Sequence, residues 1–233
     1  MAKNRIYDIP ARAINKFRRH FFPVDFDLLD GFLNEVAGVI HIGANMGQER
    51  ESYASLGLNV VWVEPIPAVF EKLRSNISGL SNQRAYRYLL AAEDGRDYKL
   101  HIADNGGASS SILDFAKHRK LHPDIHYVEE IQVKATTLVR LIEIEKIDLN
   151  DYGAIVLDTQ GSELLVLKGA IPVLDKFRFV KTEVADFESY AGCCQLAELT
   201  EFMRELGFVV SHKAPVVALD GVGTYYDVVY GRP

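Results

Sequence analysis

VIHIGANMGQERESYASL, residues 39–56, joins a short strand to a helix through a glycine-rich turn and thereby sets the class of fold. Residues 39–42 form an apolar run with the length of a buried strand, and residues 47–56 have the pattern of a helix. Gly43 and Gly47 lie in the turn, where glycine allows the backbone to bend sharply and to approach a ligand. The N-terminal N–H groups of the helix would then point at that ligand.

Strands and helices alternate along the rest of the chain. Apolar runs predict strands at 59–63, 86–91, 154–157 and 179–184, and amphipathic patterns predict helices at 67–77, 162–170 and 195–206. Two last strands, 208–211 and 224–230, are joined by a glycine-rich loop. This alternation predicts βαβ units around a mostly parallel α/β sheet, with ligands bound beyond the carboxyl ends of its strands.

The middle of the chain, about 93–135, departs from this alternation. It contains a predicted hairpin arm at 98–102, the small-residue loop GGASSS at 106–111 and a strand at 131–134, followed by a helix at 137–146. We expect an insertion that walls the site rather than a separate domain. The expected organisation is an N-terminal helical segment, 1–37, followed by one domain, 38–233.

Length and composition are those of a globular domain. Of the 233 residues, 48% are hydrophobic and 25% charged, which argues against disordered and fibrous classes. A net charge of −6 is unfavourable for binding phosphate backbones, so no nucleic-acid partner is expected. The chain has no apolar run long enough to span a membrane and no signal-peptide pattern, and its cysteines, Cys193 and Cys194, cannot form a disulfide framework. The expected compartment is the cytoplasm.

Residues 1–22 differ from the acidic remainder because they carry six basic residues and one acidic residue. Ile14, Phe17 and Phe21 recur at helical spacing between these cations. A surface-active helix that touches an anionic membrane or a partner is one interpretation. The other, which we favour, is a helix on the domain edge with buried aromatic residues and solvated cations.

Two further groups of residues carry weaker signals. His118, His122 and His126 recur every four residues, as ligands on one helical face would, but Pro123 interrupts that helix and no metal site is expected. Cys193 and Cys194 are expected as small buried residues rather than nucleophiles, because nothing nearby in the sequence would lower a thiol pKa.

Glu64 follows the 59–63 strand, about twenty residues after the glycine turn, where a carboxylate can accept hydrogen bonds from both ribose hydroxyls of a nucleoside. The turn has the spacing G-x-x-x-G rather than the G-x-G-x-x-G of dinucleotide sites. A nucleoside without phosphates therefore suits this acidic chain better than a dinucleotide. The alternative is an ordinary glycine-rich turn followed by a solvated acid.

A second polar cluster follows the 154–157 strand. Asp158, Gln160 and Glu163 stand at its carboxyl end, where Asp158 would point into the predicted crevice. Asp158 or Ser162 could instead cap the next helix. Capping alone leaves Gln160 and Glu163 unexplained.

The stretches HIGANMGQE, WVEPIPAVFEKLRSNI, SSSIL, TTLVRLI and LDTQGSELLVLKGA make residues 38–230 resemble the FkbM family of methyltransferases. The resemblance implies an enzyme dependent on S-adenosylmethionine (SAM), with S-adenosylhomocysteine (SAH) as product. It implies a Rossmann-like class I methyltransferase fold, a seven-stranded, mostly parallel sheet with a C-terminal antiparallel hairpin. The implied reaction is O-methylation of a sugar, glycan or related natural product.

The resemblance also assigns roles to individual residues. Cofactor-binding positions would be His41, Gly43, Ala44, Asn45, Gly47, Glu64, Pro65, Ala91, Ala92, Ser109 and Ser110. Gln160 and Glu163 would bind the acceptor. Asp158 is the first candidate and Glu183 the second for the base that takes the proton of the acceptor hydroxyl.

The chain departs from the family pattern at two positions. His41 stands where an aspartate is usual, and Val156 where a lysine is common. Because His41 lacks the carboxylate that would attract the cationic SAM, we expect weakened or redistributed cofactor affinity. This motivates a second hypothesis, a catalytically silent SAM-fold protein that binds a partner or glycan. A nicotinamide dehydrogenase is third, and the missing third glycine disfavours it.

Overall fold

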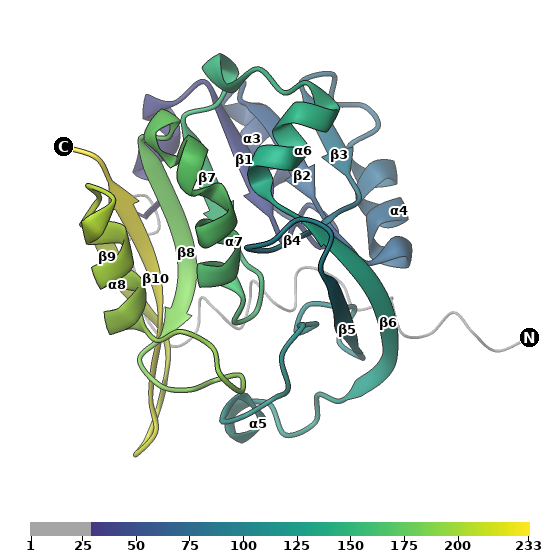
Figure 1. The fold of residues 1–233 in the computed structure, drawn as a ribbon, viewed down its shortest axis with the longest axis vertical. Helices are drawn as coiled ribbons and strands as arrows, with labels where there is room; N and C mark the ends of the chain where they lie inside the picture. The colour runs from purple at the N-terminus through teal and green to yellow at the C-terminus, as the bar shows by residue number, and fades with distance from the viewer. Residues whose placement is uncertain (1–28) are drawn as a thin grey trace, which may run out of the picture.

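A computed structural model describes residues 29–233, in which seven strands form one sheet in the order β3-β2-β1-β7-β8-β10-β9 (Figure 1). The strands are β1 (Gly38–Ile42), β2 (Asn59–Val63), β3 (Gln83–Tyr86), β7 (Ala154–Leu157), β8 (Phe179–Ala185), β9 (Val209–Leu219) and β10 (Gly223–Gly231). Pairing is parallel from β3 to β8, and β10 is antiparallel to both β8 and β9. The predicted sheet with its antiparallel hairpin is confirmed.

Helices cover both faces of this sheet because successive strand side chains point to opposite sides. On one face, Ile40 and Ile42 share a core with α6 (Leu138–Glu145), α7 (Glu163–Ala170) and α8 (Leu196–Glu205). On the other, Val39 and Trp62 pack with η1 (Gly31–Glu35), α3 (Arg50–Ser55) and α4 (Pro67–Asn76). Short 3-10 turns, η2 (Leu149–Asp151) and η3 (Ile171–Lys176), flank β7 and α7.

Two strands of the insertion pair with β4 in a second, three-stranded sheet of order β4-β6-β5. Its strands are β4 (Leu89–Leu90), β5 (Asp97–Ala103) and β6 (Tyr127–Thr136), and the short helix α5 (His118–Leu121) lies between β5 and β6 in the chain. In Figure 1, β5 and β6 run side by side away from β4.

The predicted third strand, 86–91, is wrong in its position. The strand that pairs with β2 is β3, Gln83–Tyr86, while β4 leaves the main sheet and pairs with β6. The strand was missed because its sequence, QRAY, is polar. Its Gln83 is nevertheless buried, since its side chain accepts a hydrogen bond from the Trp62 indole. No apolar alternation marks such a strand in the sequence.

No helix within 29–233 combines the length and the apolar character needed to cross a membrane. The expected N-terminal helix with Ile14, Phe17 and Phe21 lies outside the described residues, as does most of the expected segment 1–37.

Sheet order places the reversal of chain direction along the sheet between β1 and β7. From β1 the chain builds outward to β2 and β3, and from β7 it builds the other way to β8. Open parallel sheets bind ligands at such a point, outside the carboxyl ends of the strands. The glycine turn after β1 and Asp158 after β7 therefore meet, and the Asp158 N–H donates to the Ile42 carbonyl at 3.0 Å.

Candidate active site

A pocket opens at the carboxyl ends of β1, β2 and β7 and is closed on another side by the insertion. The lining that the sequence predicted comprises His41, Gly43, Ala44, Asn45, Glu64, Pro65, Ser110, Asp158 and Gln160. Further lining that the sequence did not single out includes Gln48, Glu49, Ile66, Tyr88, Leu89, Leu90, Leu100 and Ser111.

The turn after β1 has a backbone that only glycine adopts without strain at its first position. Gly43 has φ +81°, and a Cβ there would lie 1.9 Å from the Asp158 carbonyl oxygen. The N–H groups of Gly43 and Ala44 both donate to the Val63 carbonyl, at 3.0 and 3.1 Å. The turn is thus pressed between the ends of β2 and β7.

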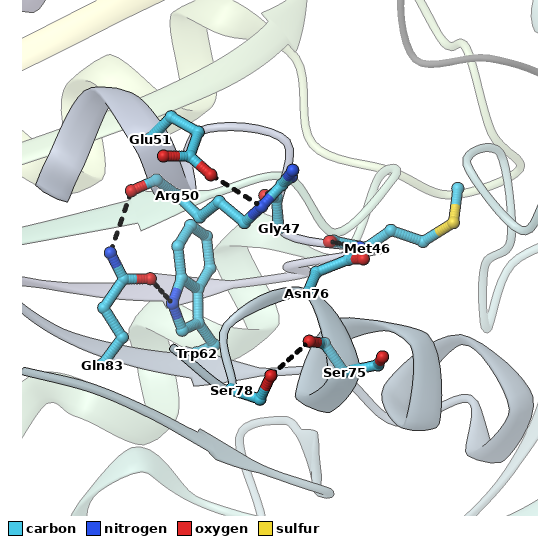
Figure 2. Close-up of polar contacts among 9 residues, drawn as sticks. All are labelled: Met46, Gly47, Arg50, Glu51, Trp62, Ser75, Asn76, Ser78 and Gln83. Atoms are coloured by element: carbon cyan, nitrogen blue, oxygen red, sulfur yellow. Dashed lines mark hydrogen bonds and ion pairs between the residues drawn. The ribbon is translucent and has the colours of Figure 1, made fainter. Parts of the chain in front are cut away.

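Side chains behind the turn hold its second half, as Figure 2 shows. The Asn76 amide of α4 donates to the Met46 carbonyl at 2.8 Å, and the Arg50 guanidinium donates to the Gly47 carbonyl at 3.1 Å. Gly47 does not line the pocket; a Cβ on it would come within 2.7 Å of the Leu73 side chain. Gly47 therefore serves the packing of the turn against α4.

Glu64 is buried at the end of β2 and held in one orientation. Its Oε2 accepts from the Asn45 N–H and its Oε1 from the Ile66 N–H, both at 2.9 Å. Burial raises the pKa of Glu64 to about 7, although both backbone N–H groups favour the charged form. Each carboxylate oxygen has two lone-pair sites, so both can accept a further hydrogen bond from a pocket ligand.

The polar cluster after β7 divides between two cavities. Asp158 lines the main pocket, Glu163 and Glu183 line a second, smaller cavity, and Gln160 lines both. Glu163 is turned into its own loop, where its Oε1 accepts from the Thr159 and Gly161 N–H groups at 3.0 and 3.1 Å. Burial raises the pKa of Glu163 to about 7.

Two of the three consecutive serines in the insertion, Ser110 and Ser111, line the pocket, whereas Ser109 does not. Ser110 lines the pocket, and its Oγ accepts from the Ala103 N–H at 3.0 Å. Ser109 is buried behind it, with Oγ accepting from the Asn105 amide at 2.9 Å. Ser111, which the sequence did not single out, lines the pocket and donates to the Gln160 carbonyl at 2.7 Å.

Ala91 and Ala92 lie outside the pocket lining. Both pack against α7, where a Cβ on Gly169 would lie 2.1 Å from the Ala91 carbonyl oxygen. The β4 side of the pocket is instead lined by Tyr88, Leu89 and Leu90. β4 pairs with β6, which is distant in sequence, so the position of these residues depends on a long-range contact.

His41 is a neutral, buried ring. It stacks on Trp62 with centroids 4.9 Å apart, and its Nδ1 lies 3.1 Å from the Tyr53 hydroxyl. Burial lowers the pKa of His41 to about 4. Val156 is its direct neighbour on β7, so the two departures from the family pattern occupy adjacent positions in the sheet. A neutral imidazole beside an apolar side chain leaves no unpaired charge there.

The remaining candidates lie apart from the main pocket. α5 ends at Leu121, before Pro123, and among residues 29–233 no three His, Cys, Asp or Glu side chains are placed to share a metal ion. Cys193 and Cys194 are buried beside the second cavity. Burial raises the pKa of Cys194 to about 12, which leaves its thiol protonated at neutral pH.

Strand order, the antiparallel end of the sheet and the pocket at the reversal point define the class I methyltransferase fold. Solved structures with this fold include magnesium protoporphyrin IX methyltransferase (ChlM) from Synechocystis PCC 6803 with bound SAM, which is 9% identical with a TM-score of 0.50 over 96% of this chain and 92% of that one. M. capricolum TrmK in complex with SAH is 6% identical, with a TM-score of 0.52 over 91% of this chain and 70% of that one.

The methyltransferase FkbM domain matches residues 41–210, so the chain belongs to the FkbM methyltransferase family. A curated relative, 2-O-methyltransferase NoeI of Sinorhizobium fredii, is 26% identical over 182 residues, which are 73% of this chain and 72% of the relative. The protein is therefore a methyltransferase, as the sequence predicted.

Proposed function

We propose that this protein is a SAM-dependent O-methyltransferase that acts on a hydroxyl group of a sugar, a glycan or a related natural product. The charge of the pocket carries the proposal. Three carboxyl groups, those of Glu49, Glu64 and Asp158, line it, and among the described lining residues none is lysine or arginine. Such a lining suits a cationic nucleoside without phosphates and disfavours a dinucleotide.

The residues present fit SAM. Glu64 is oriented by two backbone N–H groups, and both of its oxygens have a further lone pair. It would therefore accept hydrogen bonds from the ribose hydroxyls. Leu89 and Leu90 provide an apolar wall suited to a purine ring, and the turn from Gly43 to Asn45 would lie along the methionine part. When bound, SAM supplies an electrophilic methyl group on a positively charged sulfur.

This chain's own contribution is to position the acceptor and to remove a proton. An acceptor hydroxyl must lose its proton when its oxygen takes up a methyl group, so a base within hydrogen-bond reach of that hydroxyl is needed. Asp158, which lines the same pocket as Glu64, would accept that proton. Holding an oxygen about 3 Å from the methyl carbon provides much of the acceleration.

An oxygen acceptor is supported by the relative named as a 2-O-methyltransferase. A test is methyl transfer from isotopically labelled SAM to a panel of methyl glycosides of hexoses and 6-deoxyhexoses, analysed by mass spectrometry. We expect mono-O-methylated product from at least one glycoside. SAM binding without transfer to any of them would contradict this substrate class and favour the silent SAM-fold alternative.

Cofactor affinity should depend on pH through Glu64. Because the ionised carboxylate accepts both hydroxyls, and its pKa is about 7, protonation at lower pH removes acceptor capacity. Affinity is therefore retained above pH 7 and lost as the pH falls below it, by about tenfold between pH 8 and pH 6. Calorimetric titration with SAH across this range measures the change. Glu64→Gln, the matched control, should bind more weakly and show a flat profile; an equally steep profile would assign the dependence to another group.

A further inference from the structure

Tyr190 is a buried hydroxyl donor directed at the residues after β7. It lies on the segment that follows β8, its side chain is 1% exposed, and burial raises its pKa well above the usual range. Its hydroxyl donates to Gln160 Oε1 at 2.6 Å. The hydroxyl therefore remains protonated at neutral pH and acts as a fixed donor.

The side-chain amide of Gln160 connects Tyr190 to Asp158 through two hydrogen bonds. Its Nε2 donates to Asp158 Oδ1 at 2.5 Å, while its backbone is held at φ +53° and its carbonyl accepts from Ser111. An ionised carboxylate can only accept hydrogen bonds, so the amide nitrogen must face Asp158 and the amide oxygen must face Tyr190. The three residues form a relay with one direction of donation, Tyr190 to Gln160 to Asp158.

The insertion holds Tyr190 in place. The Tyr190 ring stacks on the His118 ring, with centroids 5.0 Å apart. The His118 ring stacks in turn on Phe115 at 5.1 Å, and Phe115 stacks on Tyr127 at 3.9 Å. The backbones of Phe115 and Tyr190 form a β-bridge, and the His118 N–H donates to the Ser189 carbonyl at 3.0 Å. Rings from three segments thus fix the donor at the start of the relay.

We propose that Tyr190 is a positioning residue for methyl transfer, which acts through Gln160 to hold the Asp158 carboxylate toward the acceptor hydroxyl. The role rests on the proposed function of Asp158 as the base. A carboxylate tied at one oxygen by an oriented amide loses its rotational freedom before the reaction, and orientation of this kind is what makes a positioned base effective. Through these contacts the insertion influences the orientation of Asp158.

Tyr190→Phe keeps the ring in the stack and removes only the donor. We expect kcat to fall about five- to tenfold, the loss of one hydrogen bond, with the KM of the acceptor and the Kd of SAH changed less than twofold. Tyr230→Phe is the matched control, because Tyr230 is equally buried and its hydroxyl lies 2.9 Å from Thr200, away from both cavities. It should leave kcat unchanged.

A double-mutant cycle separates positioning from general packing. In an Asp158→Asn background, Tyr190→Phe should lower the residual turnover less than twofold, because the group that it positions has already been removed. The same five- to tenfold loss in that background, or a loss of SAH affinity equal to the loss of kcat, would overturn the proposal.

NMR of protein labelled at the tyrosine Cζ carbons tests the relay without any acceptor. Gln160→Leu should shift the Tyr190 resonance strongly and Asp158→Asn should shift it less, while the Tyr230 resonance stays in place. An unchanged Tyr190 resonance in both variants would refute the relay. If no glycoside is methylated, the proposed function fails on its own, and the relay is still decided by these spectra.

Discussion

Asp158→Asn is expected to lower the turnover number by about 10²- to 10⁴-fold, the usual contribution of a positioned general base. SAH should still bind with a Kd within about threefold of the wild-type value, because asparagine has the same shape and the ribose contacts are assigned to Glu64. The large effect follows from the position of Asp158. It lines the pocket at the carboxyl end of β7 and accepts a hydrogen bond from the Gln160 amide.

Steady-state rates on a methylated glycoside, combined with calorimetry using SAH, measure both quantities. Asp175→Asn is the control, since Asp175 is an exposed residue on η3 that pairs with its neighbour Lys176 at 3.6 Å. Turnover and SAH affinity that fall together would reassign Asp158 to cofactor binding. Unchanged turnover would remove it from the mechanism.

Gly43→Ala is expected to abolish SAH binding and to destabilise the domain by about 4 kcal/mol or more, among the largest losses seen for one substitution. Two costs add. A non-glycine residue at φ +81° is strained, and its Cβ would lie 1.9 Å from the Asp158 carbonyl oxygen, so the ends of β1 and β7 must separate. That separation displaces both the turn and Asp158.

Gly57→Ala isolates the first cost, the backbone strain. Gly57 has φ +69°, close to that of Gly43, but a Cβ there meets no atom within 4 Å. It should cost only about 1–2 kcal/mol of backbone strain and leave SAH binding intact. Urea unfolding and calorimetry compare the two variants. Equal stability losses would show that the contact with Asp158 is unimportant.

The sequence predicted those features that follow from parallel-sheet geometry. Glu64 and Asp158 each come directly after an apolar strand, and the carboxyl ends of parallel strands lie at one edge of a sheet. The structure brings both to one pocket, 94 residues apart in the chain. The sequence also predicted a sharp bend of the backbone at Gly43, and the φ of +81° at this residue agrees with that prediction.

Features that depend on contacts between distant segments could not be predicted. The carboxylate of Glu163 is turned toward N–H groups of its own loop, which no residue pattern encodes. Tyr190 reaches Gln160 across 30 residues because the insertion packs against the segment after β8. Polar β3 carried no strand pattern, since its buried Gln83 is satisfied by Trp62 and by the Arg50 carbonyl.

Direct calorimetric titration of the wild-type protein with SAM and SAH at pH 8 tests whether this acidic pocket binds SAM through Glu64. We predict one site for each ligand. Glu64→Ala should weaken both by about 1–3 kcal/mol, or roughly 5- to 150-fold, while Glu71→Ala, an exposed glutamate of α4, should have no effect. Absence of binding to the wild-type protein, or equal affinity in Glu64→Ala, would show that this pocket does not bind SAM through Glu64.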